Sequence, residues 1–81
     1  MEQLVELTEY LVKNIAPNSD KVEVSLTEAD GVNIIKVLVL EEDMSLVIGK
    51  GGVIANSIRT VVQAAAYSSK LGKVRINIDS L

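Results

Sequence analysis

Three glycines within four positions, Gly49, Gly51 and Gly52, interrupt the part of the chain that is otherwise most prone to form helix. Glycine in a helix interior costs about 0.5–1 kcal/mol relative to alanine, so one continuous helix across this stretch is disfavoured. The chain has 81 residues, a size at which a single hydrophobic core only just suffices. Either the segment is merely a turn, or another molecule must approach the backbone there.

Apolar side chains before the glycines follow two different periods. Residues 2–15 repeat them at spacings of three and four, which predicts an amphipathic helix with an acidic outer side. Residues 21–29 alternate apolar and polar side chains, as a half-buried strand does. Asp30-Gly31 is a strong signal for a two-residue hairpin turn, and the more apolar residues 33–41 are the expected return strand.

The remaining segments complete the predicted order of elements. Residues 41–49 predict a short helix with Asp43 as its N-cap, residues 53–69 a long helix, and residues 73–79 a final strand. Strands of a hairpin pair antiparallel, whereas a strand reached through two helices can lie parallel to a neighbour. We therefore expect an α+β fold of order α-β-β-α-α-β, with a mixed three-stranded sheet covered by helices on one face, as a single domain over residues 1–81.

Composition limits the chemistry that this chain can perform. Without cysteine or histidine, neither a disulfide nor a thiolate or imidazole metal site can form. No serine–base pair or pair of carboxylates stands out as catalytic machinery, so we expect no enzyme, no metal and no cofactor. The acidic amphipathic start differs from a signal peptide, and no stretch approaches the roughly 20 apolar residues of a membrane span. A cytoplasmic protein is the expectation.

Charge is distributed unevenly along the chain. The formal net charge is −3, but residues 1–43 carry −7 and residues 44–81 carry +4. Such asymmetry between halves can mark an anion-binding face. It can also arise by chance in so short a chain, and the charge pattern alone does not decide between the two.

The glycine segment resembles one known phosphate-contacting motif and not others. The Walker pattern fails because Lys50 is followed by Gly51, and the dinucleotide pattern G-x-G-x-x-G fails at Ile54. The pattern that fits is G-x-x-G, Gly49-Lys50-Gly51-Gly52, between two helices. The segment "VIGKGGVIANSIRTVV" resembles the signature of KH domains, and the order of elements resembles their type II fold over essentially the whole chain. Small size, an acidic first helix and a single KH unit make the chain similar to the bacterial KhpA family of stand-alone KH proteins.

This resemblance implies that the glycine loop clamps single-stranded RNA. The first N–H groups of a helix lack intrahelical partners and favour anions, missing Cβ atoms allow a sugar–phosphate backbone to come close, and Lys50 adds a positive charge. The GxxG loop of KH domains clamps about four nucleotides. The resemblance also implies a groove between the middle helices and the last strand. The candidate RNA-binding residues are Ile48, Gly49, Lys50, Gly51, Gly52, Ala55, Arg59, Lys70 and Lys73.

Several of these candidates have an ordinary structural alternative. Arg59 lies about two turns beyond the loop and could reach a phosphate or simply be a solvated arginine; the same alternative is open for Lys70 and Lys73. Tyr10 falls in the first helix and Tyr67 near the end of the long one, so we expect no aromatic platform for bases. Binding by one copy should therefore be weak and poorly selective for sequence.

The long helix carries more aliphatic residues than a small sheet can cover. The surplus predicts a self-association patch, whose candidates are Ile58, Val61, Val62 and Ala65, although all four could instead be core. The KhpA resemblance implies a homodimer that also pairs with a larger Jag (KhpB)-type protein, linked to cell elongation and division. The leading hypothesis is a non-catalytic RNA chaperone or post-transcriptional regulator. The alternative is a dimerising partner-recruitment module for which RNA is secondary.

Overall fold

The computed structural model describes all residues, 1–81, and its elements follow the order predicted from the sequence. Two short 3₁₀ turns, η1 and η2, are added to it. The elements in chain order are α1 (Glu2–Lys13), η1 (Ser19–Lys21), β1 (Glu23–Ala29), β2 (Val32–Val39), α2 (Glu41–Ile48), η2 (Lys50–Gly52), α3 (Val53–Ser68) and β3 (Val74–Ser80).

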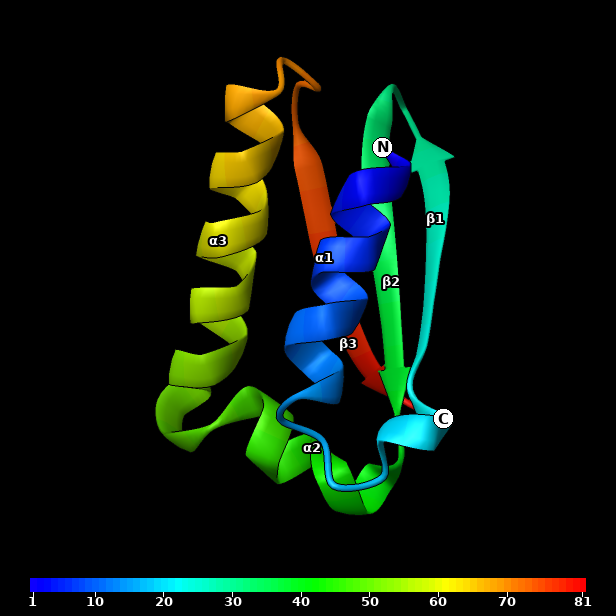
Figure 1. Ribbon diagram of the computed structural model, residues 1–81, viewed down its shortest axis with the longest axis vertical. Helices are drawn as coiled ribbons and strands as arrows, with labels where there is room; N and C mark the ends of the chain where they lie inside the picture. Colours follow the sequence, from blue (N-terminus) through cyan, green and yellow to red (C-terminus); the bar gives the residue numbers. More distant parts are fainter.

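The sheet is mixed, as predicted. Its strand order is β1-β2-β3, with β1 antiparallel to β2 and β3 parallel to β2. Both α1 and α3 lie against the same face of the sheet (Figure 1), and the other face carries no helix. The edge of β3 that does not pair with β2 is bordered by α3, so helix and edge strand together form one side of the molecule.

The core lies between the sheet and the two long helices. In β2 every second residue points inward, and Ile35, Val37 and Val39 are completely buried, as the two-residue period of a strand requires. The matching residues of β3 are Val74 and Ile76. The helices close this layer with Leu4 and Val12 from α1, Val47 from α2, and Ile58, Val62 and Ala66 from α3. An aliphatic core with no aromatic residue results.

The hairpin between β1 and β2 has the predicted two-residue turn. Ala29 pairs with Val32, which leaves only Asp30 and Gly31 between the strands. Both turn residues have positive φ, 54° and 76°, as a type I′ turn requires. This turn fixes the register in which Val24 of β1 lies opposite the inward-facing Val37 of β2, while Ile34 and Leu38 of β2 lie on the other face of the sheet.

The prediction that Asp43 caps α2 was wrong. The N-cap is Leu40, and Asp43 lies inside the first turn with only 2% of its surface exposed. Its carboxylate accepts hydrogen bonds from the Asn18 backbone N–H (3.0 Å) and from Asn18 Nδ2 (2.9 Å). Both carboxylate oxygens thus bond to Asn18, which satisfies the buried acid and fastens the α1–β1 connection to α2.

None of the helices combines the length with the apolar composition that crossing a lipid bilayer demands.

Candidate nucleic-acid interface

The glycine loop between α2 and α3 owes its composition to backbone conformation. Gly49 (φ 78°, ψ 170°), Gly51 (φ 66°) and Gly52 (φ 81°) all have positive φ. Residues with a Cβ atom rarely adopt such angles, and the region occupied by Gly49 is essentially restricted to glycine. A tight connection between two helices therefore accounts for three glycines in four positions.

The two sides of this loop differ. A Cβ atom on Gly49 would lie 2.7 Å from Ile54 Cγ1, so this glycine faces the protein and permits close packing against α3. A Cβ atom on Gly51 would meet nothing within 4 Å, and both Gly51 and Lys50 are exposed to solvent. The backbone at Lys50 and Gly51 is consequently open to an approaching molecule, while Gly49 holds the loop in place.

The loop leads directly into the N-terminus of α3, a helix of 16 residues. Its N-cap is Gly52, no side chain caps it, and its first turn contains no acidic residue. The aligned peptide dipoles of a helix place partial positive charge at this end, which favours a phosphate or another anion. Lys50 has no carboxylate partner, because the one ion pair in the structure joins Lys13 and Glu9. The combination is suited to a phosphodiester backbone.

Arg59 connects α3 to the last strand. Its Nε donates a hydrogen bond to the Ile76 carbonyl oxygen (3.2 Å), and its Nη1 donates to Asn56 Oδ1 (3.1 Å). Arg59 is thus a half-buried bridge over the free edge of β3 rather than a freely solvated arginine. A guanidinium has five N–H donors, so Arg59 retains donors beyond these two bonds.

Gln63 covers the same edge and was not among the residues singled out from the sequence. Its Nε2 donates to the Val74 carbonyl oxygen (3.4 Å), one step of four residues after Arg59. The only available signal was the spacing of polar residues along the outer side of the helix, since the acceptors are backbone atoms and leave no trace in the sequence. Together, Arg59 and Gln63 line the path between α3 and β3.

The remaining RNA-binding candidates do not all gather at one place. Ile48 is half-buried beside the loop, whereas Ala55 is only 1% exposed and belongs to the interior. Lys70 and Lys73 are exposed, but they lie at the turn between α3 and β3 (Figure 1), at the other end of a helix about 24 Å long. The candidates therefore form two groups, one at each end of α3.

The dimer candidates also divide. Ile58 and Val62 are 4% and 0% exposed and form part of the monomer core, so Val62 is not available to a partner and Ile58 contributes only to the floor of a neighbouring groove. Val61 is 47% exposed, and Ala65 is half-buried. An apolar groove of about 250 Å³ lies beside Val61 between α1 and α3, and its lining residues are Leu11, Ile15, Val53, Ile54, Ser57, Ile58 and Val61.

The site offers no cluster of metal ligands. No group of three or more acidic side chains converges as such ligands would. What the geometry provides is an exposed glycine backbone, an uncapped helix N-terminus and unpaired cations. Such features are suited to binding an anion.

The fold and the loop together define a class of protein. A mixed α-β-β-α-α-β domain in which a G-x-x-G loop joins the middle helices has the features of a type II KH domain. The family model described as "KhpA/KhpB, KH domain" matches residues 5–78. The chain therefore belongs to the KhpA/KhpB family of KH domains.

Several relatives share most of this chain, and each is named RNA-binding protein KhpA. The protein from Caldanaerobacter subterraneus subsp. tengcongensis is 45% identical over 65 residues, which is 80% of this chain and 87% of the relative. The protein from Clostridium acetobutylicum is 43% identical over 61 residues, 75% of this chain and 81% of the relative. The protein from Aquifex aeolicus is 34% identical over 73 residues, 90% of both chains.

Proposed function

We propose that this chain is a non-catalytic protein that binds single-stranded RNA in the cytoplasm, with the glycine loop as the clamp. The observation that carries the proposal is the open backbone at Lys50 and Gly51, directly in front of the uncapped N-terminus of α3. Relatives named RNA-binding proteins cover most of the chain, which supports RNA as the ligand. A role as RNA chaperone or post-transcriptional regulator, linked to cell elongation and division, follows from the family resemblance.

A single strand suits this site better than a duplex. Backbone N–H groups at a helix end and one lysine can engage a few successive phosphates, and KH loops hold about four nucleotides. Bases of a single strand are free to turn toward the groove between α3 and β3, whereas paired bases are not. Because few charges take part, we expect modest affinity and weak sequence preference from one copy of the domain.

The experiment that tests this proposal changes the charge of the loop and keeps its shape. In the double variant Lys50→Asp/Gly51→Asp, two carboxylates stand where phosphates should lie. The matched control is Lys50→Asn/Gly51→Asn, which has nearly the same shape without the negative charge. Asp and Asn both tolerate the positive φ of Gly51 better than most residues, so both variants should fold.

We expect the aspartate variant to bind single-stranded RNA about tenfold or more weakly than the wild type, because like charges brought together cost several kcal/mol. The asparagine control should lose only the charge of Lys50. Fluorescence anisotropy measures binding, and thermal melting followed by circular dichroism checks the fold. Wild-type affinity should also fall as salt rises, with a log–log slope of about −0.7 per phosphate contacted. Equal affinity of all three folded proteins would refute the clamp.

A second candidate function, recruitment of a protein partner, is favoured by the groove beside Val61. We propose that this groove, exposed between α1 and α3, is where a second copy or a Jag (KhpB)-type KH protein docks. Two linked copies would raise avidity for RNA without any new contact. Replacing Val61 with glutamate should produce monomers, while the same substitution at exposed Thr60 serves as control. Sedimentation of a wild type that is already monomeric at micromolar concentration would contradict the homodimer.

A further inference from the structure

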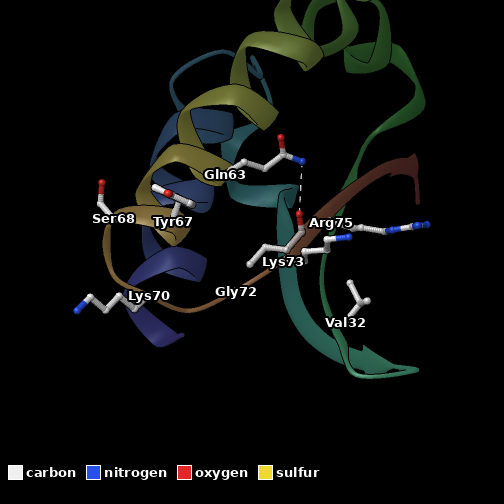
Figure 2. A pocket seen from close by; sticks show the side chains of 9 residues that line it. Val32, Gln63, Tyr67, Ser68, Lys70, Gly72, Lys73 and Arg75 are labelled. Carbon is white, nitrogen blue, oxygen red and sulfur yellow. Dashed lines mark hydrogen bonds between the residues drawn. The ribbon is translucent and has the colours of Figure 1, made fainter.

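A broad hollow on the surface lies at the end of α3 remote from the glycine loop. It has a volume of about 1090 Å³ and lies between the C-terminal turn of α3, the α3–β3 connection and the start of β3 (Figure 2). Its lining residues are Val32, Gln63, Tyr67, Ser68, Lys70, Gly72, Lys73, Val74 and Arg75. The clamp residues Gly49–Gly52 do not contribute to it.

The hollow begins where a regular series of hydrogen bonds between α3 and β3 ends. Arg59 bonds to Ile76, and Gln63, four residues further along the helix, bonds to Val74, two residues earlier in the strand. Continued by one more step, the same spacing would reach Tyr67 and Gly72, and both of these residues line the hollow. Glycine has no side chain to fill the space, and a Cβ atom there would meet nothing within 4 Å. The surface therefore opens between the helix and the beginning of β3.

Tyr67 leaves an aromatic ring without a protein partner in this place. It is 85% exposed, in a chain with only two aromatic residues. Aromatic rings are the surfaces on which unpaired bases stack, and each such contact raises affinity by about fivefold or more. The sequence suggested no stacking platform because Tyr67 is far from the glycine loop along the chain. In the structure it lies at the end of the same α3–β3 path that Arg59 and Gln63 line.

The charge of the hollow is positive and unneutralised. Lys73 and Arg75 belong to its lining, no acidic residue does, and neither cation forms an ion pair. Figure 2 shows Lys70 on the other side of the turn, with its ammonium group directed away from these two side chains. Asp79, the one acid after residue 43, lies near the opposite end of β3. Lys73 and Arg75 are therefore free to meet anions.

The order of the strands separates the acidic residues of β1 from this side. Glu23 and Glu28 belong to β1, and β2 separates that strand from β3. The uneven charge of the two chain halves thus becomes an uneven charge across the sheet. A polyanion that enters at the glycine loop meets cations, and no acid from β1, as it follows α3 toward the turn.

We propose that this hollow is a second contact for the same RNA strand, in which one base stacks on Tyr67 and neighbouring phosphates pair with Lys73 and Arg75. The strand then extends beyond the clamp, along the free edge of β3 covered by Arg59 and Gln63, and ends over the α3–β3 turn. This second contact rests on the proposed RNA-binding function and adds a distinct site with its own chemistry. It makes affinity depend on RNA length.

The first test compares oligoadenylates of about four and about eight nucleotides, the sizes of a single clamp and of an extended track. The wild type should bind the longer RNA about fivefold or more tightly, which corresponds to one added stacking contact. Equal affinity for both lengths, with the short RNA still bound, would overturn the second contact and leave the proposed function intact. Failure of both RNAs to bind would overturn the proposed function itself.

The second test uses matched variants at the two tyrosines. Tyr67→Ala should abolish the gain from length and leave binding of the short RNA unchanged. Tyr10→Ala removes the other exposed tyrosine, on α1, and should change neither affinity. Because both rings are exposed, both variants should fold. A Tyr67→Ala protein that retains the wild-type ratio of affinities would contradict the stacking contact.

The third test examines the phosphate contacts through salt. The double variant Lys73→Gln/Arg75→Gln should reduce the log–log salt slope for the longer RNA by about 0.7 for each phosphate that is no longer neutralised, and leave the slope for the short RNA unchanged. Lys21→Gln removes an exposed cation beside β1 and serves as control for charge alone. An identical change of slope in the control and the double variant, or a change with the short RNA, would overturn the assignment of these two cations.

Discussion

Glycine and lysine residues flank α3 at both ends, yet the two ends differ in how they pack against the rest of the protein. At the first end, Gly49 packs against Ile54, and α2 is fastened from behind by the bonds between Asp43 and Asn18. At the second end, Gly72 has open space around it, and Tyr67 stands without a partner. The glycine loop at the first end is held by contacts within the protein, whereas Gly72 and Tyr67 at the second end make few such contacts. This difference is suited to the proposed RNA binding, in which the packed end would hold the strand and the open end would accommodate a base.

The largest expected difference between the two ends concerns their glycines. Gly49→Ala places a Cβ atom 2.7 Å from Ile54 in a backbone region reserved for glycine. Overpacking and strain should lower the free energy of unfolding by about 2–5 kcal/mol. Gly72 also has a positive φ, but a Cβ atom added there would meet no other atom, so Gly72→Ala should lower the free energy of unfolding by only about 1–2 kcal/mol. Denaturant unfolding measures both. Equal losses would show that packing does not distinguish the two ends.

A smaller effect should follow from releasing α2. Asp43→Ala leaves the Asn18 backbone N–H and side-chain amide without their acceptor, which should lower the free energy of unfolding by about 1–3 kcal/mol. Glu42→Ala, the exposed neighbouring acid, is the control. Hydrogen exchange should accelerate at Gly49–Gly52 in the Asp43 variant and remain unchanged at the α3–β3 turn. Equal acceleration at both places would contradict the local role of this fastening.

The smallest effect is expected midway along the helix. Gln63→Ala removes one long hydrogen bond of 3.4 Å to Val74, at a carbonyl that water can reach once the side chain is gone. The free energy of unfolding should fall by no more than about 1 kcal/mol. Because the hollow would then extend toward Arg59, the affinity for longer RNA should change by more than the free energy of unfolding does. A large loss of stability would mean that the edge contacts organise the fold rather than the path between the two sites.

The order of elements was predictable because it is written in local periodicity. The change from a period near four to a period of two separates residues 2–15 from residues 21–29, and Asp30-Gly31 fixes the turn that follows. The glycine loop was equally visible, since three residues without a Cβ atom so close together indicate a backbone that ordinary residues cannot adopt. These features depend on neighbours a few positions away.

The features that could not be predicted depend on partners far along the chain. Asp43 has the residue type of an N-cap, but its partner Asn18 lies 25 residues earlier. Arg59 bonds to a carbonyl 17 residues later, and a carbonyl is the same whatever residue carries it. Val61 and Val62 are neighbours in the sequence, but neighbouring side chains of a helix point in different directions, so Val61 lies on the surface and Val62 in the core. The aliphatic pattern predicted an apolar face of the helix but could not show which of its residues are buried in the core and which are exposed.

The hydrogen bonds between α3 and β3 determine whether the connection between these two elements can change in length. Four residues of helix rise about 6 Å and two residues of strand about 6.6 Å, so helix and strand advance nearly in step. Arg59 and Gln63 consequently fix the register of β3 relative to α3. If the strand slipped by one residue, the carbonyl groups at their two positions would point toward β2 and could no longer accept these hydrogen bonds. The alignment of the strand is set by its two neighbours and not by the connection before it. Insertions at the exposed positions of residues 69–73 should therefore leave the strand in place and alter the shape of the adjoining surface, whereas Leu71, which packs against the core, must be kept.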